Sequence, residues 1–385
     1  MKISIIALGT RGDLQPLIAL AYGLKKTGHQ LEIILDSDYE YLIKRYPFSY
    51  ILINGVQTMF EQNTVINKMN NCYHACEESD AIIFSPHPFS VIGYHIAEKL
   101  DIPCFWASGF PSFSSPEIPD EFLPGVNIYG FYNQHFHYLL SQWREKDLKL
   151  SSLGLDPACP PWKRMREEKL PFLYFFSKHL LSKSSTWPDS AYISGFWFLD
   201  THPEWMPSDR LLTFLENGAK SIYFNFGSVY IQNPDNIINL IQETIKGTHY
   251  QAIITIDKKS LKKQPDPSSI LLMDSIPHSY LFNHVELVVH HGGVNTVGEI
   301  LRAGVPSVPV PFMTDGPLWS HLLNKKGLCP KPVHYNQLSP YVLADSIHNA
   351  LNDEDSILRL RKIKNLILSE KGVEYAVKII NNYFL

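Results

Sequence analysis

Residues 290–320 read HHGGVNTVGEILRAGVPSVPVPFMTDGPLWS and follow an apolar run at residues 287–289. The run is typical of a buried strand, and the glycine-rich turn after it leads into apolar residues at helical spacing up to Leu301. Gly304 is placed to end this helix, and residues 307–311 are typical of a second strand. The stretch therefore predicts a strand–turn–helix–strand unit. Its turn lies at a helix N-terminus, where backbone N–H groups can hold a phosphate.

The loop after the second predicted strand adds polar groups beside this turn. Thr314 and Asp315 would lie at the same carboxyl edge of the sheet, which is where open α/β sheets bind ligands. A nucleotide joined to a hydroxyl-rich group would fit both places. A Gly-Gly pair alone would favour the simpler interpretation, an ordinary βαβ unit with a tight turn.

The start of the chain repeats the same pattern. Lys2–Leu8 is predicted to be a strand, Gly9–Asp13 a turn, and the residues from Leu14 to Gly28 a helix with regularly spaced apolar positions. Residues 31–35 follow as a second strand. The glycines of the turn do not have GxGxxG spacing, so the pattern gives little support to a dinucleotide site.

Length and composition indicate a soluble globular protein. The chain has 385 residues, a length sufficient for two domains. Hydrophobic residues make up 45% of it and charged residues 19%, which is ordinary for a soluble globular protein. Its net charge of −4 gives no reason to expect a nucleic-acid partner, and no apolar run is long enough for a transmembrane helix. The five cysteines are scattered and odd in number, which favours reduced thiols and a cytoplasmic location.

Two short patterns invite interpretation as metal sites. Cys72-x-His74-x-Cys76 has no fourth ligand nearby, and Asp36-Ser37-Asp38 directly follows a predicted strand. Structural roles are expected for both, and no metal site is predicted.

The stretch at residues 290–320 resembles the nucleotide-sugar signature of the family 1 glycosyltransferases, the group that contains the plant and animal UDP-glycosyltransferases. Within that family the chain is most similar to the bacterial antibiotic and sterol glycosyltransferases, over nearly its whole length. The resemblance implies an α/β fold with the GT-B architecture, two Rossmann-like domains with parallel sheets that face each other across a cleft. With the boundary in the Pro-bearing stretch after residue 200, residues 1–200 would form the acceptor domain and residues 201–385 the nucleotide-sugar domain. The last helix would cross back to the first domain.

The resemblance also implies donor-binding residues in both domains. They are Thr10, Arg11, Gly12, Ser228, Ile276, His278, His291, Gly293, Asn295, Thr296, Glu299 and Asp315. His291 and the residues after it would hold the diphosphate, Glu299 the ribose hydroxyls, and the segment at His278 the nucleobase. Relatives commonly carry Asp-Gln, with both side chains on sugar hydroxyls, where this chain has Asp315-Gly316. The missing Gln favours a deoxysugar, or a hexose other than glucose.

The reaction implied is an attack by an acceptor hydroxyl on the anomeric carbon, with inversion. Asp13 would be the general base that takes the hydroxyl proton. No cofactor is expected besides the UDP or dTDP sugar as co-substrate, because N–H donors at the helix start can stabilise the departing diphosphate without a metal.

Aromatic residues are concentrated between Phe105 and Trp143. This region would either line an apolar acceptor pocket, with Trp106, Phe110 and Phe113 as candidates, or pack between helices. The acceptor is expected to be a small molecule or lipid-like. The charged run at residues 163–169 is compatible with a weak contact with a membrane surface.

Two other functions stay open at this point. A GT-B sugar-nucleotide epimerase or hydrolase would share the architecture without needing the aromatic region. A non-catalytic nucleotide-sugar-binding partner is favoured only by the missing Gln, and Asp13, His291 and Glu299 argue against it.

Overall fold

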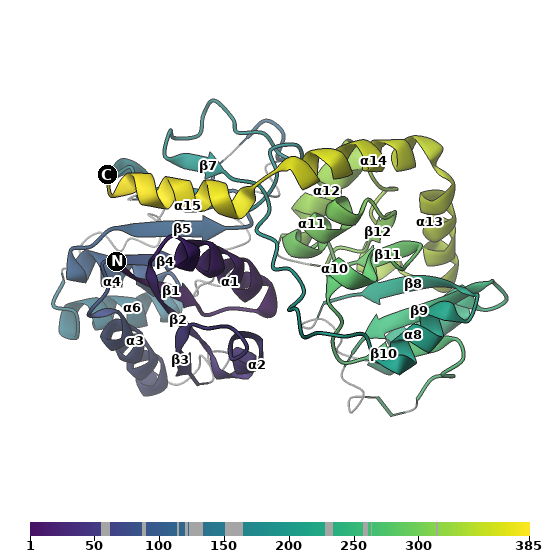
Figure 1. Ribbon diagram of the computed structural model, residues 1–385, viewed down its shortest axis with the longest axis horizontal. Coiled ribbons are helices and arrows are strands. Elements are labelled where there is room, and N and C mark those ends of the chain that lie inside the picture. The colour runs from purple at the N-terminus through teal and green to yellow at the C-terminus, as the bar shows by residue number, and fades with distance from the viewer. Residues whose placement is uncertain are drawn as a thin grey trace. The chain divides into compact units, whose positions relative to one another are not determined.

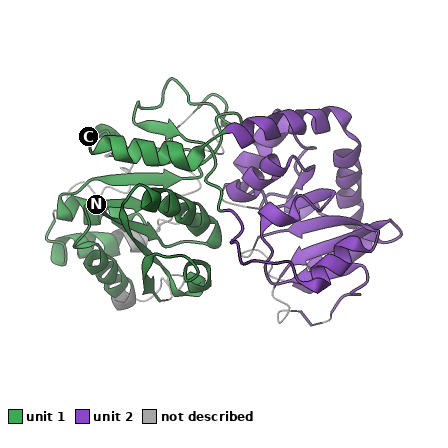
Figure 2. Cartoon of the chain, viewed as in Figure 1, with its two compact units in different colours: residues 1–199, 370–385 green, residues 200–369 purple. Residues whose placement is uncertain are grey.

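The computed structural model describes residues 1–54, 62–86, 90–113, 115–119, 122, 134–150, 165–227, 234–256, 261–262, 264–312 and 315–385. The chain divides into two compact units (Figure 2). The first unit comprises Met1–Leu199 with Glu370–Leu385, and the second comprises Asp200–Ser369. This division lies one residue before the boundary that the sequence predicts.

The first unit is built on a parallel sheet of seven strands (Figure 1). In spatial order the strands are β3 Ser49–Ile53, β2 Gln30–Asp36, β1 Lys2–Ala7, β4 Ala81–Phe84, β5 Cys104–Ser108, β6 Phe172–Tyr174 and β7 Ala191–Ile193. Both faces of the sheet are covered, which agrees with the nearly continuous apolar sequences of these strands.

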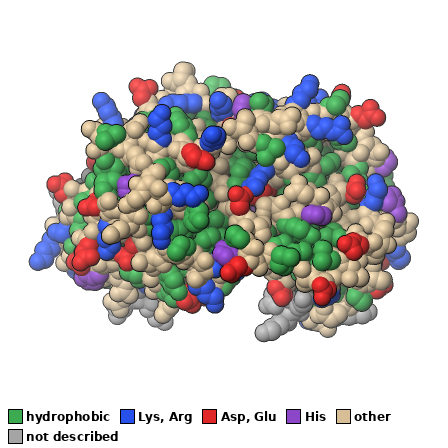
Figure 3. Space-filling view, in the orientation of Figure 1, with side chains coloured by type: hydrophobic (Ala, Val, Ile, Leu, Met, Phe, Trp, Pro, Cys, Tyr) green, Lys and Arg blue, Asp and Glu red, His purple; other side chains and the backbone are tan. Residues whose placement is uncertain are grey.

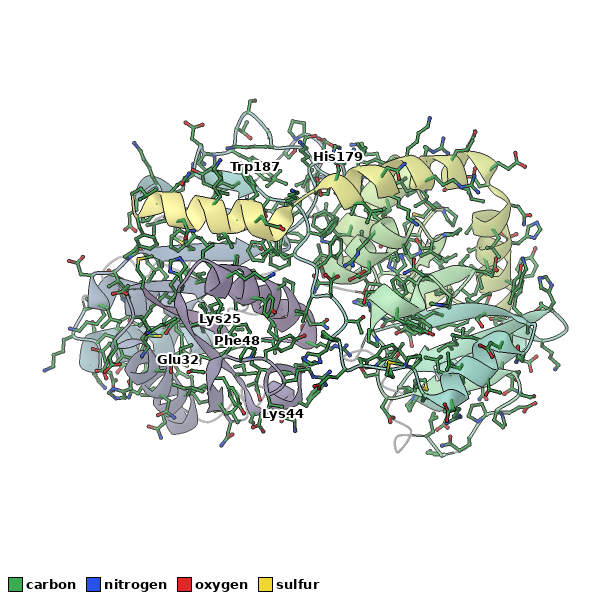
Figure 4. All side chains as sticks on the ribbon, viewed as in Figure 1. Lys25, Glu32, Lys44, Phe48, His179 and Trp187 are labelled. Carbon is green, nitrogen blue, oxygen red and sulfur yellow. The ribbon has the colours of Figure 1, made fainter. Side chains whose placement is uncertain are left out.

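The helices described in this unit are α1 Arg11–Lys26, α2 Glu40–Ile43, α3 Gln62–Cys76, α4 Ile92–Leu100, α6 Gln134–Lys146 and α15 Gly372–Tyr383. Successive residues of β5 point to opposite faces, so Phe105 contacts Tyr383 of α15 while Trp106 contacts Phe84 on the other face. Helices α1 and α15 lie side by side in Figure 1. Lys25 of α1 lies over the ring of Phe48, with its Nζ 5.6 Å from the ring centroid (Figure 4).

The second unit has a parallel sheet of five strands. In spatial order they are β10 Ile270–Met273, β9 Tyr250–Thr255, β8 Lys220–Asn225, β11 Leu287–His290 and β12 Ser307–Pro309. Its helices are α8 Asp209–Glu216, α9 Pro234–Ile245, α10 His278–Leu281, α11 Val294–Ala303, α12 Gly316–Lys325, α13 Pro340–Asn352 and α14 Glu354–Ser369. The predicted fold class, α/β with parallel sheets in two units, is confirmed.

Strand order identifies where each sheet can bind a ligand. The order reverses between β1 and β4 in the first unit and between β8 and β11 in the second. Ligands of doubly wound sheets bind outside the carboxyl ends of the strands at this reversal. The turns that follow β1, β8 and β11 are therefore the places to look for a site.

The first helix differs from its prediction. The sequence predicts a start at Leu14, after a turn that includes Asp13, but α1 begins at Arg11. The reason is a capping box, in which Thr10 is the N-cap and Asp13, the third helical residue, bonds back to it. The helix predicted after the Gly-Gly turn ends at Gly304 as expected, with that residue in the left-handed conformation.

Acidic and basic side chains are interspersed on the face shown in Figure 3. Within the described parts of the chain, no helix combines the length and the apolar character needed to cross a membrane.

Candidate functional site

The turn after β11 depends on two glycines. Gly292 has a φ of +90°, and a Cβ there would lie 2.6 Å from both the Gly316 carbonyl oxygen and Ser320 Oγ. A Cβ on Gly293, the N-cap of α11, would lie 2.5 Å from His291 Nε2. Only glycine fits at either position without displacing its neighbours. Helix α11 therefore starts immediately beside the His291 ring.

His291 is held by the end of the neighbouring strand. Its backbone N–H donates to the Asn225 carbonyl oxygen at 3.1 Å, and its Nδ1 lies 3.4 Å from the same oxygen. Because a carbonyl can only accept, Nδ1 carries a proton and Nε2 faces Gly293. Burial lowers the pKa of His291, against the opposing effects of the Asp315 carboxylate and the Asn225 carbonyl. The imidazole is therefore largely neutral at neutral pH.

His290 supports the turn from a buried position. It is completely buried, and its Nδ1 accepts the backbone N–H of Gly292 at 3.1 Å. Burial lowers the pKa of His290 to about 3, so the ring is neutral. This arrangement supports a structural role for His290.

Asn225 is a site residue for which the sequence offered no role. It ends β8 opposite His290, and its Oδ1 accepts the backbone N–H of Gly227 at 3.0 Å. Its Nδ2 lies 3.4 Å from His278 Nε2. Asn225 thus joins three segments of the site. The signal in the sequence is a polar residue at a strand end, directly before a glycine turn.

A pocket of about 240 Å³ in the second unit contains two predicted donor residues, His278 and Glu299. It is lined by His278, Ser279, Asn283, Glu299, Arg302, Ala303, Lys364 and Leu368. The His278 ring stacks on Phe282, with the ring centroids 4.6 Å apart. A carboxyl, an imidazole and two cationic side chains in one small pocket suit a polar ligand rich in hydroxyl groups.

Glu299 is held in an environment that favours its protonated form. Burial raises the pKa of Glu299 to about 7, opposed by Arg302, whose Nη1 lies 3.7 Å from Glu299 Oε1. Arg302 is also paired with Asp200, with Nη2 2.5 Å from Oδ1. The carboxyl can therefore change its charge near neutral pH.

Of the remaining predicted donor-binding residues of the second unit, some lie at the start of α11, one lies in the core, and one lies outside the described residues. Asn295 and Thr296 lie in the first turn of α11, where Thr296 is buried and Asn295 is partly buried, and Asp315 contacts the start of that helix. The Ile276 side chain is 2% exposed and packs in the core, so only its backbone is left to contact a donor. Ser228 and Thr314 lie outside the described residues.

In the first unit, the predicted base Asp13 lies in the first turn of α1 with Arg11 and Gly12. Its Oδ2 accepts hydrogen bonds from the backbone N–H and the Oγ1 hydroxyl of Thr10, at 2.8 and 2.9 Å. Oδ1 receives no hydrogen bond from the described residues. Asp13 therefore has one oxygen whose position is fixed by Thr10.

The three acceptor candidates lie inside the first unit. Trp106, Phe110 and Phe113 are buried, with at most 7% of each residue exposed. Phe113 packs on Phe172 and on Trp187, which Figure 4 labels, at centroid distances of 4.9 and 6.1 Å. This burial favours core packing, and contact with an acceptor stays a prediction. Residues 123–133 and 151–164, which include part of the aromatic region and the start of the charged run, lie outside the described residues.

The two metal-like patterns have structural explanations. Cys72 and Cys76 are buried on one side of α3, whereas His74 is exposed and pairs with Glu77 at 3.2 Å. The Asp36 carboxylate accepts the backbone N–H two residues later, at 3.0 Å. Among the residues that the structure describes, no three His, Cys, Asp or Glu side chains form a group that could hold a metal ion.

Comparison with known families agrees with this geometry. The model of the glycosyltransferase family 28 N-terminal domain matches residues 3–83, and the model of the UDP-glucoronosyl and UDP-glucosyl transferases matches residues 189–366. Both models describe glycosyltransferases, and together they match segments of both units, so the chain is similar to glycosyltransferases in each unit. The second match covers the elements from β8 into α14 and contains every residue of the site described in the second unit except Leu368.

Individual relatives give the same result. The sterol 3-beta-glucosyltransferase of Emericella nidulans is 28% identical in an alignment 428 positions long, which covers 99% of this chain and 30% of that protein. The sterol 3-beta-glucosyltransferase of Cryptococcus neoformans var. neoformans serotype D is 28% identical in an alignment 433 positions long, which covers 99% of this chain and 27% of that protein. The chain thus spans less than a third of the length of these curated relatives.

Two solved structures share the fold over nearly the whole chain. The calicheamicin glycosyltransferase CalG4 has a TM-score of 0.70 at 18% identity, covering 99% of this chain and 97% of its own. The spinosyn rhamnosyltransferase SpnG, complexed with thymidine diphosphate, has a TM-score of 0.68 at 16% identity, covering 99% and 100%. Both are glycosyltransferases with the GT-B fold.

Proposed function

We propose that this chain is an inverting, metal-independent glycosyltransferase. It would move a hexose or deoxyhexose from a UDP or dTDP sugar to a hydroxyl of a small-molecule or lipid-like acceptor. The observation that carries the proposal is the turn His291–Gly293 at the start of α11, where the strand order reverses, with the pocket of His278 and Glu299 in the same unit. These features suit a diphosphate and a nucleoside, respectively.

The diphosphate would be held by the first turn of α11 and by His291. Backbone N–H groups at a helix start carry partial positive charge and bind phosphate oxygens without a metal. A dianionic group beside His291 would raise the pKa of its imidazole and so add a proton at Nε2. His291 could then donate a hydrogen bond to the departing diphosphate, where negative charge develops in the transition state.

Asp13 would act as the general base. Thr10 fixes its Oδ2 with two hydrogen bonds, so the orientation of the carboxylate does not depend on the substrate. Oδ1 is then the atom that takes the acceptor hydroxyl proton as the new glycosidic bond forms and the bond to the diphosphate breaks.

Sterols are the acceptor class to test first. The curated relatives described above are named sterol 3-beta-glucosyltransferases, and their similarity extends over 99% of this chain. A sterol offers one hydroxyl on a rigid apolar body, which fits the expectation of a lipid-like acceptor.

A transfer assay tests this function. The protein is incubated with UDP-glucose and a sterol, then with dTDP-glucose and the same sterol, and the steryl glucoside and free sugar are quantified by mass spectrometry. Sterol-dependent glucoside with a β anomeric configuration supports the proposal, since the donor sugar is α-linked. Release of free sugar at the same rate with and without sterol would identify a hydrolase. Donor binding without any turnover, with these glucose donors and with UDP and dTDP donors that carry another hexose or a deoxyhexose, would favour the non-catalytic binding partner.

A further inference from the structure

Asp315 occupies the N-cap position of α12, yet its carboxylate makes no capping hydrogen bond to that helix. Its Oδ2 instead accepts a hydrogen bond of 2.9 Å from the backbone N–H of Val294, the first residue of α11. Gly293, the N-cap of α11, has no side chain with which to make this bond. The first amide of the helix proposed to bind phosphate is therefore capped by a residue 21 positions later in the chain.

The backbone beside Asp315 touches the glycine-rich turn directly. A Cβ on Gly316 would lie 2.4 Å from the His291 carbonyl oxygen, and a Cβ on Gly292 would lie 2.6 Å from the Gly316 carbonyl oxygen. Both distances are too short for a side chain, so the start of α12 and the turn fit together only because both positions are glycine. The Asp315 side chain thus acts between two segments that are already in backbone contact.

We propose that Asp315 is a positioning residue for the diphosphate. By capping α11, its carboxylate would keep the turn His291–Gly293 and the next amides of the helix aligned for a nucleoside diphosphate. The resemblance to relatives would instead assign sugar hydroxyls to an Asp at this place. This inference rests on the proposed function, because it concerns the same donor site.

The two roles differ in what they do to free nucleotide. If Asp315 positions the turn, Asp315→Ala lowers the affinity for UDP and for UDP-glucose by the same factor, about tenfold if realigning the turn costs about 1.4 kcal/mol on binding. If Asp315 only binds the sugar, the substitution lowers the affinity for UDP-glucose and leaves the affinity for UDP unchanged. Asp315→Asn keeps an acceptor oxygen for the Val294 N–H, so it should bring UDP affinity back to within about threefold of wild type.

Isothermal titration calorimetry with UDP and UDP-glucose, and with dTDP and dTDP-glucose, measures these affinities in wild type and both variants. Ser339→Ala is the matched control, since Ser339 caps α13 through the Val342 N–H in the same unit. It should lower the melting temperature while nucleotide affinity stays unchanged.

We expect Asp315→Ala to lower the affinities for nucleotide and sugar nucleotide equally, and Asp315→Asn to restore both. If Asp315→Ala leaves the UDP affinity unchanged or raises it, the inference is wrong but the proposed function still stands. The same holds if Ser339→Ala lowers the UDP affinity as much as Asp315→Ala does. Wild-type protein that binds none of the four nucleotides overturns the proposed function, and the inference with it.

Discussion

The substitution Asp13→Asn separates two roles that Asp13 combines. Its Oδ2 accepts two hydrogen bonds from Thr10 and so closes the capping box of α1, while Oδ1 is the atom proposed to take a proton. Asn in the same rotamer presents its carbonyl oxygen to Thr10 and its amide nitrogen in place of Oδ1. The variant therefore keeps the cap and loses the base.

The expected effects differ greatly in size. Loss of a general base lowers turnover by about 10²–10⁴-fold, equivalent to about 3–5 kcal/mol in the activation free energy. The free energy of unfolding should fall by only about 0.3–1 kcal/mol, because the first turn of α1 loses a negative charge that interacts with the helix dipole. At about 2–4 °C per kcal/mol for a unit of this size, the melting temperature should fall by a few degrees at most.

Three measurements on one preparation test this prediction. Initial rates at saturating donor and acceptor give turnover, calorimetry gives the UDP affinity, and differential scanning calorimetry gives the melting temperature. Asp13→Ala is the comparison variant, since it also loses both bonds to Thr10 and should be less stable than Asp13→Asn at equal loss of turnover. An Asp13→Asn protein that is folded, binds UDP and transfers sugar at nearly the wild-type rate would show that another group takes the proton.

Three further predictions concern metal, pH and packing. Treatment with EDTA should leave the transfer rate unchanged, and a rate that falls and returns with Mg²⁺ or Mn²⁺ would contradict metal independence. Because burial raises the pKa of Glu299 to about 7, its carboxylate forms between pH 6 and pH 8, and the ionised form is the better acceptor for ribose hydroxyls. The ratio of wild-type to Glu299→Gln affinity for UDP should therefore rise about tenfold over that range, whereas a constant ratio would separate Glu299 from the nucleotide. A Cβ on Gly372 would lie 2.3 Å from the Phe196 carbonyl oxygen, so Gly372→Ala should cost about 1–3 kcal/mol of unfolding free energy in denaturant titrations, and an unchanged midpoint would show that α15 can shift freely.

The fold could be predicted because its signals are local. Apolar strands, glycine turns and helical periodicity repeat in both halves of the chain, and a βαβ connection in a parallel sheet leaves few topologies. Helix α11 and its end at Gly304 follow from this pattern. The start of α1 was placed three residues late, because Thr10 and Asp13 form a capping box that includes an Arg-Gly pair usually found in turns.

The contacts of the site could be predicted only in part. Periodicity places a residue on a strand end or a helix turn, but it does not say which strand ends are adjacent. Asn225 acquires its role because β8 and β11 are neighbours in the sheet, although 61 residues of chain separate the end of one from the start of the other. The bond from Val294 to Asp315 likewise depends on how closely α12 approaches the turn. Both contacts arise from tertiary packing between distant segments, so a pattern read from one stretch of sequence cannot predict them.

The glycine at position 316 shows how such packing changes the interpretation of a missing side chain. By sequence alone, Gly316 is a lost ligand for the donor sugar, and restoring Gln would be the obvious way to restore glucose specificity. The structure leaves 2.4 Å between a Cβ at this position and the His291 carbonyl oxygen, which is far below van der Waals contact. Any side chain there would displace the turn that is proposed to hold the diphosphate. Gly316→Gln would therefore lower the affinity for UDP as well as for the sugar. The sugar preference has to be measured on the wild-type protein, by comparing donors that share one nucleotide.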